Sequence, residues 1–219
     1  MVAALNEELA IGPTLNEVNL FLDGCKCLVV DGHSIDQTVA VAKSFKAEVV
    51  PQDNLGKGDA IAKAVEYIQG KEIEYIGMID ADFTYPAKYF PLMIEILDKN
   101  PDVGMVCGNR FCEMEPRLMP EMFFIGNMMI KHVHRLVNGI KLSDPLTGLR
   151  VFRREVVDNW VPKSKEFDIE VELNSLVKKK GYSFVEIPIE YRRRMGEKKL
   201  KAKHGVQILM RMLQESYSD

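Results

Sequence analysis

Two aspartates separated by one small residue, Asp80 and Asp82, are the side chains of this 219-residue sequence best suited to chemistry. They follow the apolar run 75–79, which has the composition of a buried strand. A divalent cation held by two carboxylates can bridge the phosphates of a bound nucleotide and offset leaving-group charge. An Asp-X-Asp turn is also a common solvated surface feature, so this pattern alone leaves both interpretations open.

Two further clusters could bind a nucleotide. Asp31 follows the apolar run 27–30, and a carboxylate at a strand end can accept hydrogen bonds from a base or a ribose. Gly56-Lys57-Gly58 combines a positive charge with glycines that let backbone amides approach a phosphate, but it lacks the spacing of a Walker loop. Each cluster also has a purely structural interpretation. The segment after Asp31 could be a strand–turn–helix corner in which Ser34 caps the helix, and Gly56-Lys57-Gly58 could be an ordinary glycine turn before a helix.

Other common chemistries lack their residues. His132 and His134 are two positions apart in an expected helix and point to different faces, which disfavours a shared metal. Ser143 and Cys107 have no base in the nearby sequence that would activate a nucleophile. The cysteines have neither the spacing nor the neighbouring histidines of a zinc site, and we expect reduced thiols at Cys25, Cys27, Cys107 and Cys112.

The composition is that of a globular chain. Lys and Arg number 29 and Asp and Glu 32, and the formal charge of −3 argues against a general nucleic-acid binder. The 47% hydrophobic content excludes a disordered chain, and no apolar run approaches the roughly 18–20 residues that span a bilayer. Residues 192–203 carry seven basic side chains and one acidic one, which indicates a solvated face or a patch for phosphate or an anionic membrane.

Short apolar runs alternate with helical patterns in the first half, which predicts a parallel sheet covered on both faces by helices. We expect strands near 1–4, 27–30, 47–50, 75–79 and 102–107, and helices near 6–23, 34–45 and 58–68 and from Pro86. Ligands bind such sheets beyond the carboxyl ends of the strands. Asn6, Asp31 and the Asp80–Asp82 pair should therefore meet at one edge.

The second half is less regular. Residues 116–140 are rich in Met and Phe and show no strand pattern, and 144–148 reads as a loop. We expect a helix at 167–180, a strand at 184–191 and a closing helix with an apolar stripe at 206–213. Without repeats or a linker, the sequence predicts one domain over 1–219, with a nucleotide-binding half of about 1–112 and an acceptor-binding half of about 113–219.

Seven motifs in this order resemble the family 2 glycosyltransferases of GT-A fold, above all the dolichol-phosphate (polyprenyl-phosphate) sugar transferases. The resemblance covers about Val2 to Leu213. The matching segments are Ala4-Leu5-Asn6-Glu7-Glu8, residues 29–36, Gly56-Lys57-Gly58, Asp80-Ala81-Asp82, Gly108-Asn109-Arg110-Phe111, residues 144–150, and Glu186-Ile187-Pro188-Ile189 followed by Arg193, Gly196 and Lys199-Leu200.

The resemblance implies an α/β fold of three layers with a central, mostly parallel sheet flanked by helices. It implies an enzyme that transfers a hexose or N-acetylhexosamine, with inversion and with Mg²⁺ or Mn²⁺, from a nucleoside-diphosphate sugar to a dolichyl phosphate. The implied metal ligands are Asp80 and Asp82, and the implied catalytic set adds Asp144 and Arg110. The implied donor site comprises Ala3, Leu5, Glu7, Val30, Asp31, Lys57, Ala81 and the metal aspartates. Arg110, Arg193 and Lys199 would contact phosphates of the donor or the acceptor. Asp144 and Arg150 would belong to the loop on the acceptor side.

The sequence departs from that family at Leu5, where an aromatic is usual, at Lys198, which replaces a serine, and at Thr84, which replaces a frequent glutamine. Many relatives carry C-terminal membrane helices and this chain has none, so we expect a cytoplasmic protein in peripheral contact with the membrane face through residues 119–130 and 192–203. Core packing is the alternative interpretation of residues 119–130. Two alternatives stay open: the same donor chemistry with a soluble sugar or phosphate acceptor, and a nucleotide-sugar-binding protein without turnover. The motifs specify neither the sugar nor the base.

Overall fold

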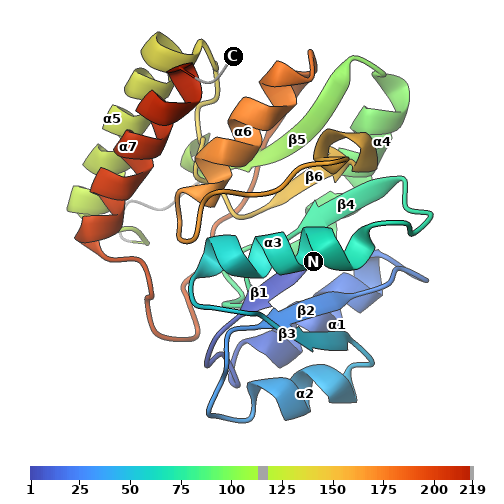
Figure 1. Ribbon diagram of the computed structural model, residues 1–219. Coiled ribbons are helices and arrows are strands. Elements are labelled where there is room, and N and C mark those ends of the chain that lie inside the picture. Colours follow the sequence, from blue (N-terminus) through green and yellow to red (C-terminus); the bar gives the residue numbers. More distant parts are fainter. Residues whose placement is uncertain (113–117, 218–219) are drawn as a thin grey trace.

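The computed structural model describes residues 1–112 and 118–217, and within them seven strands form two sheets with helices packed around them (Figure 1). The result is the α/β architecture that the sequence predicts. Three expectations fall partly outside the described residues: the boundary at 112/113, the first two residues of the 116–140 stretch, and the side chain of Lys203 in the basic run.

The first sheet is parallel, in the order β1-β2-β3. It consists of β1 (Val2–Ala4), β2 (Leu28–Asp31) and β3 (Glu48–Pro51), and every residue of β2 is buried. The helices α1 (Ile11–Phe21), α2 (Thr38–Ser44) and α3 (Lys57–Ile68) connect and follow these strands. Helix α3 packs on the first sheet through Ala60 and Ala64, which cluster with Leu28 and Val30 of β2. Its other apolar positions, Ile61, Val65 and Ile68, pack in the cluster that contains residues of the second sheet and of α6.

The second sheet has the order β4-β6-β5-β7 and is mixed. Its strands are β4 (Tyr75–Met78), β5 (Val103–Asn109), β6 (Arg150–Arg153) and β7 (Ser183–Pro188). Strand β6 runs antiparallel to both neighbours, whereas β5 and β7 are parallel. The sequence analysis did not predict β6, so the chain after the 144–148 loop enters the middle of this sheet rather than its edge.

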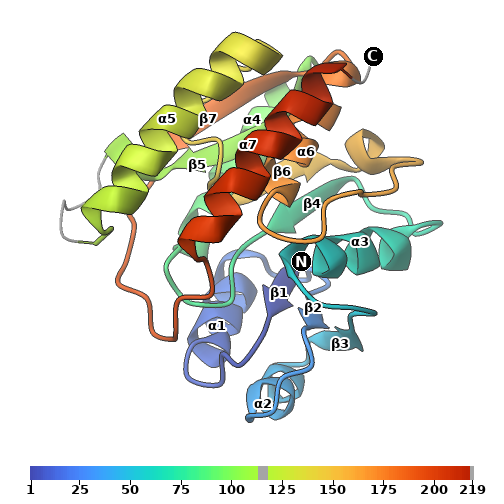
Figure 2. The ribbon, with the colours of Figure 1, turned by 60° about the vertical axis from the view of Figure 1, so that its left-hand side comes forward.

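The remaining helices are α4 (Phe90–Lys99), α5 (Glu121–Asn138), α6 (Ile169–Lys179) and α7 (Ala202–Tyr217), with 3₁₀ turns at Ala87–Tyr89, Arg110–Cys112 and Arg154–Val157. Helices α5 and α7 lie side by side at one end of the molecule, as both views show (Figures 1 and 2). They meet α6 in a buried cluster of Ile130, Val171, Ile208 and Met212. No helix in residues 1–112 and 118–217 is long and apolar enough to cross a bilayer.

Two expected helix starts are wrong, and both lie at the sheet edge where ligands bind. The helix expected from residue 6 begins at Ile11, and the helix expected from Ser34 begins at Thr38 without a side-chain cap. Ser34 is used differently: its hydroxyl accepts a hydrogen bond from the Asn6 backbone N–H at 2.9 Å, and its own N–H donates to Asp31 at 3.1 Å. The turns after β1 and β2 therefore hold each other.

Candidate functional site

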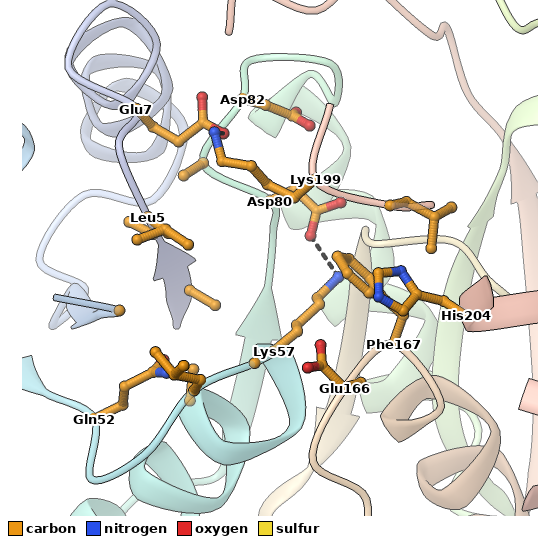
Figure 3. A pocket seen from close by; sticks show the side chains of 18 of the residues that line it. Leu5, Glu7, Gln52, Lys57, Asp80, Asp82, Glu166, Phe167, Lys199 and His204 are labelled. Atoms are coloured by element: carbon orange, nitrogen blue, oxygen red, sulfur yellow. Dashed lines mark hydrogen bonds and ion pairs between the residues drawn. The ribbon is translucent and has the colours of Figure 1, made fainter. Parts of the chain in front are cut away.

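A pocket of about 330 Å³ lies where β1, β2, β3 and β4 end (Figure 3). Its walls come from the ends of these strands, from the start of α3, and from the segments that lead into α6 and α7. The lining residues are Ala3, Ala4, Leu5, Glu7, Gly32, Gln52, Leu55, Gly56, Lys57, Ala60, Asp80, Ala81, Asp82, Glu166, Phe167, Arg194, Lys199, Leu200, Lys201 and His204.

Asp80 is held by a largely buried lysine, Lys57, whose side chain is 12% exposed. The Lys57 ammonium lies 2.7 Å from Asp80 Oδ1 and 2.7 Å from Glu170 Oε1, and Figure 3 shows the first of these contacts. Burial alone would lower the pKa of Lys57, but the carboxylates of Asp80 and Glu170 outweigh it and raise that pKa above its usual value. The same ammonium lowers the pKa of Asp80 against the opposing effect of burial. Both groups are therefore charged near neutral pH.

Gly148 gives the acceptor loop its direct contact with Asp80. A Cβ at this position would lie 2.3 Å from Asp80 Oδ2, so only glycine leaves room for the carboxylate. The Gly148 N–H donates to the Tyr85 hydroxyl at 2.7 Å, which fixes the backbone of the loop here. The loop at 144–148 thus supports Asp80 at the pocket.

Asp82 is almost completely buried, with 2% of its surface exposed. Its Oδ1 accepts hydrogen bonds from the Thr84 N–H at 3.0 Å and from the Thr84 hydroxyl at 2.5 Å. Its Oδ2 forms an ion pair with the Arg194 guanidinium. Burial and the neighbouring Asp80 charge raise the pKa of Asp82, while Arg194 and Thr84 oppose that rise.

Glu7 completes the acidic side of the pocket. It is buried, and the Lys199 ammonium lies 3.4 Å and the Arg194 guanidinium 3.9 Å from Glu7 Oε1. Among the described residues, Glu7 Oε2 has no hydrogen-bond partner. Burial raises the pKa of Glu7. Glu7 lines the pocket, and a buried acceptor without a partner on such a residue indicates a group that a ligand can satisfy.

Asp80 and Asp82 fit a divalent cation that is shared with a ligand. Within the described ranges, no group of three or more His, Cys, Asp or Glu could hold a metal ion by itself. Mg²⁺ in proteins is commonly bound by one or two carboxylates together with substrate phosphates and waters. Two adjacent carboxylates in a pocket with room for phosphates meet that pattern, so the donor set is right for a cation bound jointly with a diphosphate.

Arg110 and Asp144 form a buried ion pair. The Arg110 Nε and Nη2 donate to the two carboxylate oxygens of Asp144, each at 2.7 Å. Asp144 is fully buried, and Glu186 accepts hydrogen bonds from the backbone N–H groups of Ser143 and Asp144. Burial alone would lower the pKa of Arg110, but the Asp144 charge raises it. The bidentate geometry fixes the plane of the guanidinium.

Arg150 acts as an internal brace. It is fully buried, and it donates to the carbonyls of Pro145 (2.7 Å) and Thr147 (2.8 Å) and to Asn174 Oδ1 (2.5 Å). These bonds tie the loop at 144–148 to helix α6. The structure therefore explains Arg150 by its support of the loop.

The pocket brings together eight of the residues that the resemblance assigns to donor binding: Ala3, Leu5, Glu7, Lys57, Asp80, Ala81, Asp82 and Lys199. Val30, Asp31, Arg110 and Arg193 do not line it. Val30 is buried in the β2 core, and the Asp31 carboxylate accepts the Ser34 N–H. Arg193 is exposed.

The sequence analysis missed Arg194, Gln52, Phe167 and His204. Arg194 lies one position beyond the arginine that was chosen, in a run of three, and only its side chain reaches Asp82. The Arg194 side chain points into the pocket because two backbone hydrogen bonds hold this segment, from Arg192 N–H to Thr84 O and from Met195 N–H to Asp82 O. The local sequence does not predict these long-range bonds. Phe167 and His204 stack with ring centroids 4.9 Å apart at the pocket wall (Figure 3).

Comparison with known proteins agrees with this geometry. Residues 1–161 match the family described as Glycosyl transferase family 2. A protein from Haloferax volcanii named dolichyl-phosphate hexose transferase is 31% identical over 201 residues, which cover 91% of this chain and 85% of that protein. The dolichyl-phosphate beta-glucosyltransferase of Dictyostelium discoideum is 25% identical, and the match covers 87% of this chain and 65% of that one.

A solved structure confirms the fold expectation. Glucosyl-3-phosphoglycerate synthase from Mycobacterium tuberculosis, in complex with Mg²⁺ and uridine-diphosphate, superposes with a TM-score of 0.78 at 18% identity, over 98% of this chain and 77% of that one. This likeness establishes the GT-A fold, whereas the family rests on the sequence matches. The chain is therefore a glycosyltransferase that belongs to glycosyl transferase family 2.

Proposed function

We propose that this enzyme transfers a hexose or N-acetylhexosamine, with inversion and with the help of Mg²⁺ or Mn²⁺, from a nucleoside-diphosphate sugar to a dolichyl (polyprenyl) phosphate. One observation carries the proposal: a pocket that places Asp80 and Asp82 beside the basic groups of Arg194 and Lys199 also adjoins an apolar groove. The names of the two relatives, which both include dolichyl phosphate, support the same acceptor.

The donor side follows from charge. A nucleotide sugar must release a nucleoside diphosphate, so negative charge develops on the leaving phosphate. A divalent cation at Asp80 and Asp82 would stabilise that charge as a Lewis acid. Arg194 and Lys199 line the same pocket and would bind the diphosphate oxygens. The ends of β1–β3, with Leu5, Gly32 and Gln52 on the pocket wall, leave room for the nucleoside.

The acceptor side needs little help with proton transfer. A phosphate monoester has a second pKa of about 6, so a lipid phosphate is mostly a dianion at neutral pH and can attack the anomeric carbon directly. Inversion by one displacement requires no nucleophilic side chain. Arg110, held in plane by Asp144, would position the acceptor phosphate through the guanidinium N–H groups that do not bond to Asp144.

A second hollow, of about 250 Å³, supports a lipid acceptor. It lies between α5 and α7, and it shares Leu200 and Lys201 with the donor pocket. Apart from Asn127 and Lys201 its lining is apolar or glycine: Met122, Phe123, Gly126, Met129, Ile130, Leu146, Leu200, Gly205, Val206, Ile208 and Leu209. A chain of isoprene units in this groove would have its phosphate near the donor pocket.

Exposed apolar side chains on α5 and α7 support peripheral membrane contact. Met122 is 64% exposed and Ile125 59% on α5, and Val206 is 61% exposed on α7. Lys198 adds a positive charge next to them, with its ammonium 2.9 Å from the centre of the Phe123 ring. Apolar side chains flanked by basic ones are the usual composition of a surface that rests on anionic lipid.

The test is a radiolabelled transfer assay. Purified protein with Mn²⁺ or Mg²⁺ is given a panel of UDP- and GDP-sugars, with and without short-chain dolichyl phosphate. Label that moves to the organic phase with one donor, and no longer moves after EDTA, would support the proposal and identify the sugar and the base. Transfer to a soluble sugar or phosphate would replace the acceptor, and nucleotide-sugar binding without any product would replace catalysis by binding.

A further inference from the structure

Residues 192–199, here called the strap, lie against Asp82, one of the two aspartates proposed to hold the metal. The strap is attached by its backbone: the Arg192 N–H donates to Thr84 O at 2.9 Å and the Met195 N–H donates to Asp82 O at 3.2 Å. Its far end is held by Lys199, whose ammonium donates to the Asn6 carbonyl at 3.3 Å. The strap thus joins the turn after β4 to the turn after β1, across the mouth of the donor pocket.

Arg194 points from the strap to the position that a cation would take. Its guanidinium forms an ion pair with Asp82 Oδ2, which is the oxygen that Thr84 leaves open. Asp80 has its own counter-ion in Lys57, at 2.7 Å. Both aspartates are therefore neutralised by side chains before any metal binds. The two counter-ions differ in setting, since Lys57 side-chain exposure is 12% and that of Arg194 is 29%.

The charges around the site show what a metal meets. Glu7, Asp80, Asp82 and Glu170 contribute −4, and Lys57, Arg194 and Lys199 contribute +3, which leaves −1. A divalent cation alone would change this balance to +1, at the side of a guanidinium that already occupies Asp82. A divalent cation together with the two negative charges of a sugar-linked diphosphate restores −1. The site therefore keeps its resting charge when both ligands bind, whereas the metal alone would reverse the sign of that charge.

We propose that Arg194 is an internal counter-ion that keeps Asp82 closed to metal until a nucleotide diphosphate binds, and that its guanidinium then moves to the diphosphate. This inference rests on the proposed function, because the diphosphate is that of its donor. Metal and nucleotide then bind cooperatively, and thermodynamic linkage makes the effect reciprocal. Arg194 is in this sense a positioning residue that controls access to the metal ligands.

Two features of the site agree with this mechanism. The described residues provide no third carboxylate, histidine or cysteine, so a metal without phosphate oxygens would have two protein ligands, one of them shared with Arg194. A guanidinium binds phosphate with a planar, bidentate geometry, so a diphosphate offers Arg194 a partner as good as the carboxylate that it leaves. The exchange therefore leaves no buried charge unpaired.

The experiment measures Mn²⁺ binding without turnover. Free Mn²⁺ is counted by its electron paramagnetic resonance signal in titrations of the wild type, Arg194→Ala, Arg194→Lys and Arg193→Ala, alone and with UDP or GDP, against protein-free blanks. Melting temperatures establish that each variant is folded. Arg193→Ala is the matched control, since it removes an adjacent, exposed positive charge.

Without nucleotide, Arg194→Ala should bind Mn²⁺ at least ~5-fold more tightly than the wild type, which is the low end of ordinary coupling between sites. Arg194→Lys and Arg193→Ala should stay near the wild type. With UDP or GDP, wild-type Mn²⁺ affinity should rise by roughly tenfold or more, and in Arg194→Ala this rise should shrink.

An Arg194→Ala protein that binds Mn²⁺ no better than the wild type would overturn the inference. So would an equal gain in Arg193→Ala, because the effect would then be one of general charge. A tighter Mn²⁺ site in Arg194→Ala, with no binding of UDP or GDP to any variant, would refute the donor assignment while the counter-ion role of Arg194 stands.

Discussion

Replacement of Gly148 by alanine tests whether the acceptor loop sets the position of the metal-site carboxylate. The added Cβ would lie 2.3 Å from Asp80 Oδ2 and 2.6 Å from Asp80 Cγ, whereas ordinary van der Waals contact begins at 3.4 Å. The oxygen must therefore retreat by about 1.1 Å, the difference between 3.4 and 2.3 Å. It cannot move freely, because Lys57 holds the other oxygen at 2.7 Å.

A misplacement of about 1 Å in a reacting group costs on the order of 100-fold in rate. We therefore expect kcat/KM for sugar transfer to fall by roughly 100-fold, which is about 2.7 kcal/mol of transition-state stabilisation. Overpacking at a buried position should also lower the free energy of unfolding by about 1–3 kcal/mol. The transfer assay gives the first quantity and urea unfolding the second.

Gly70→Ala is the control that separates catalysis from stability. Gly70 has a positive φ of 71° and no neighbour within 4 Å of an added Cβ, so the change strains the backbone by about 1–2 kcal/mol and touches nothing in the pocket. Its kcat/KM should equal that of the wild type. If Gly148→Ala kept wild-type kcat/KM, or lost no more than Gly70→Ala, the loop would not position Asp80 and this reasoning would be refuted.

Further predictions concern the charged and buried groups. Asp82→Asn should abolish metal-dependent transfer while the melting temperature stays close to that of the wild type; full activity would exclude the metal mechanism. Lys57→Met should lower the free energy of unfolding in urea by about 3–5 kcal/mol, because the buried Glu170 and the half-buried Asp80 lose their counter-ion. Glu170→Gln in that background should recover part of the loss. Burial lowers the pKa of His134 to about 4, below its unfolded value of about 6.5, so the unfolded chain binds more protons between these pH values. The free energy of unfolding should therefore decline as pH falls from about 6.5 through 4, by roughly 3 kcal/mol in total. His134→Gln should flatten that profile, and His132→Gln, at an exposed position, should leave it unchanged.

The edge that carries the donor site could be predicted because its signals are local. Each of β1, β2 and β4 is an apolar run with a polar residue at its end or within two positions of it, namely Asn6, Asp31 and Asp80, and parallel strands deliver such residues to one edge. The 3.6-residue spacing of apolar side chains in α3 and the Gly56-Lys57-Gly58 turn likewise predicted that a helix begins here. Asp80, Asp82, Lys57 and Glu7 were found in this way or through the family resemblance, and they do line the pocket.

The features that could not be predicted from the sequence depend on contacts between distant parts of the chain. Strand β6 is short and begins and ends with arginine, so its pattern Arg150-Val151-Phe152-Arg153 does not distinguish a strand between two others from a surface loop. Asp31 has the right place for a nucleoside contact, but its carboxylate turns to the Ser34 N–H. The choice among Arg192, Arg193 and Arg194 depends on backbone bonds to residues more than a hundred positions away.

The position of β6 also has a consequence for how the chain reaches its folded state. Strands β4 and β5 are separated in the sheet by β6, which arrives about forty residues after β5 has been synthesised. Until then, two strand edges that will be buried have no partner, and unpaired edges promote aggregation. A protein cut after residue 112 would keep the first sheet but could not close the second. Residues 1–112 are thus not a unit of folding by themselves, because the second sheet also needs β6 and β7 from the later part of the chain.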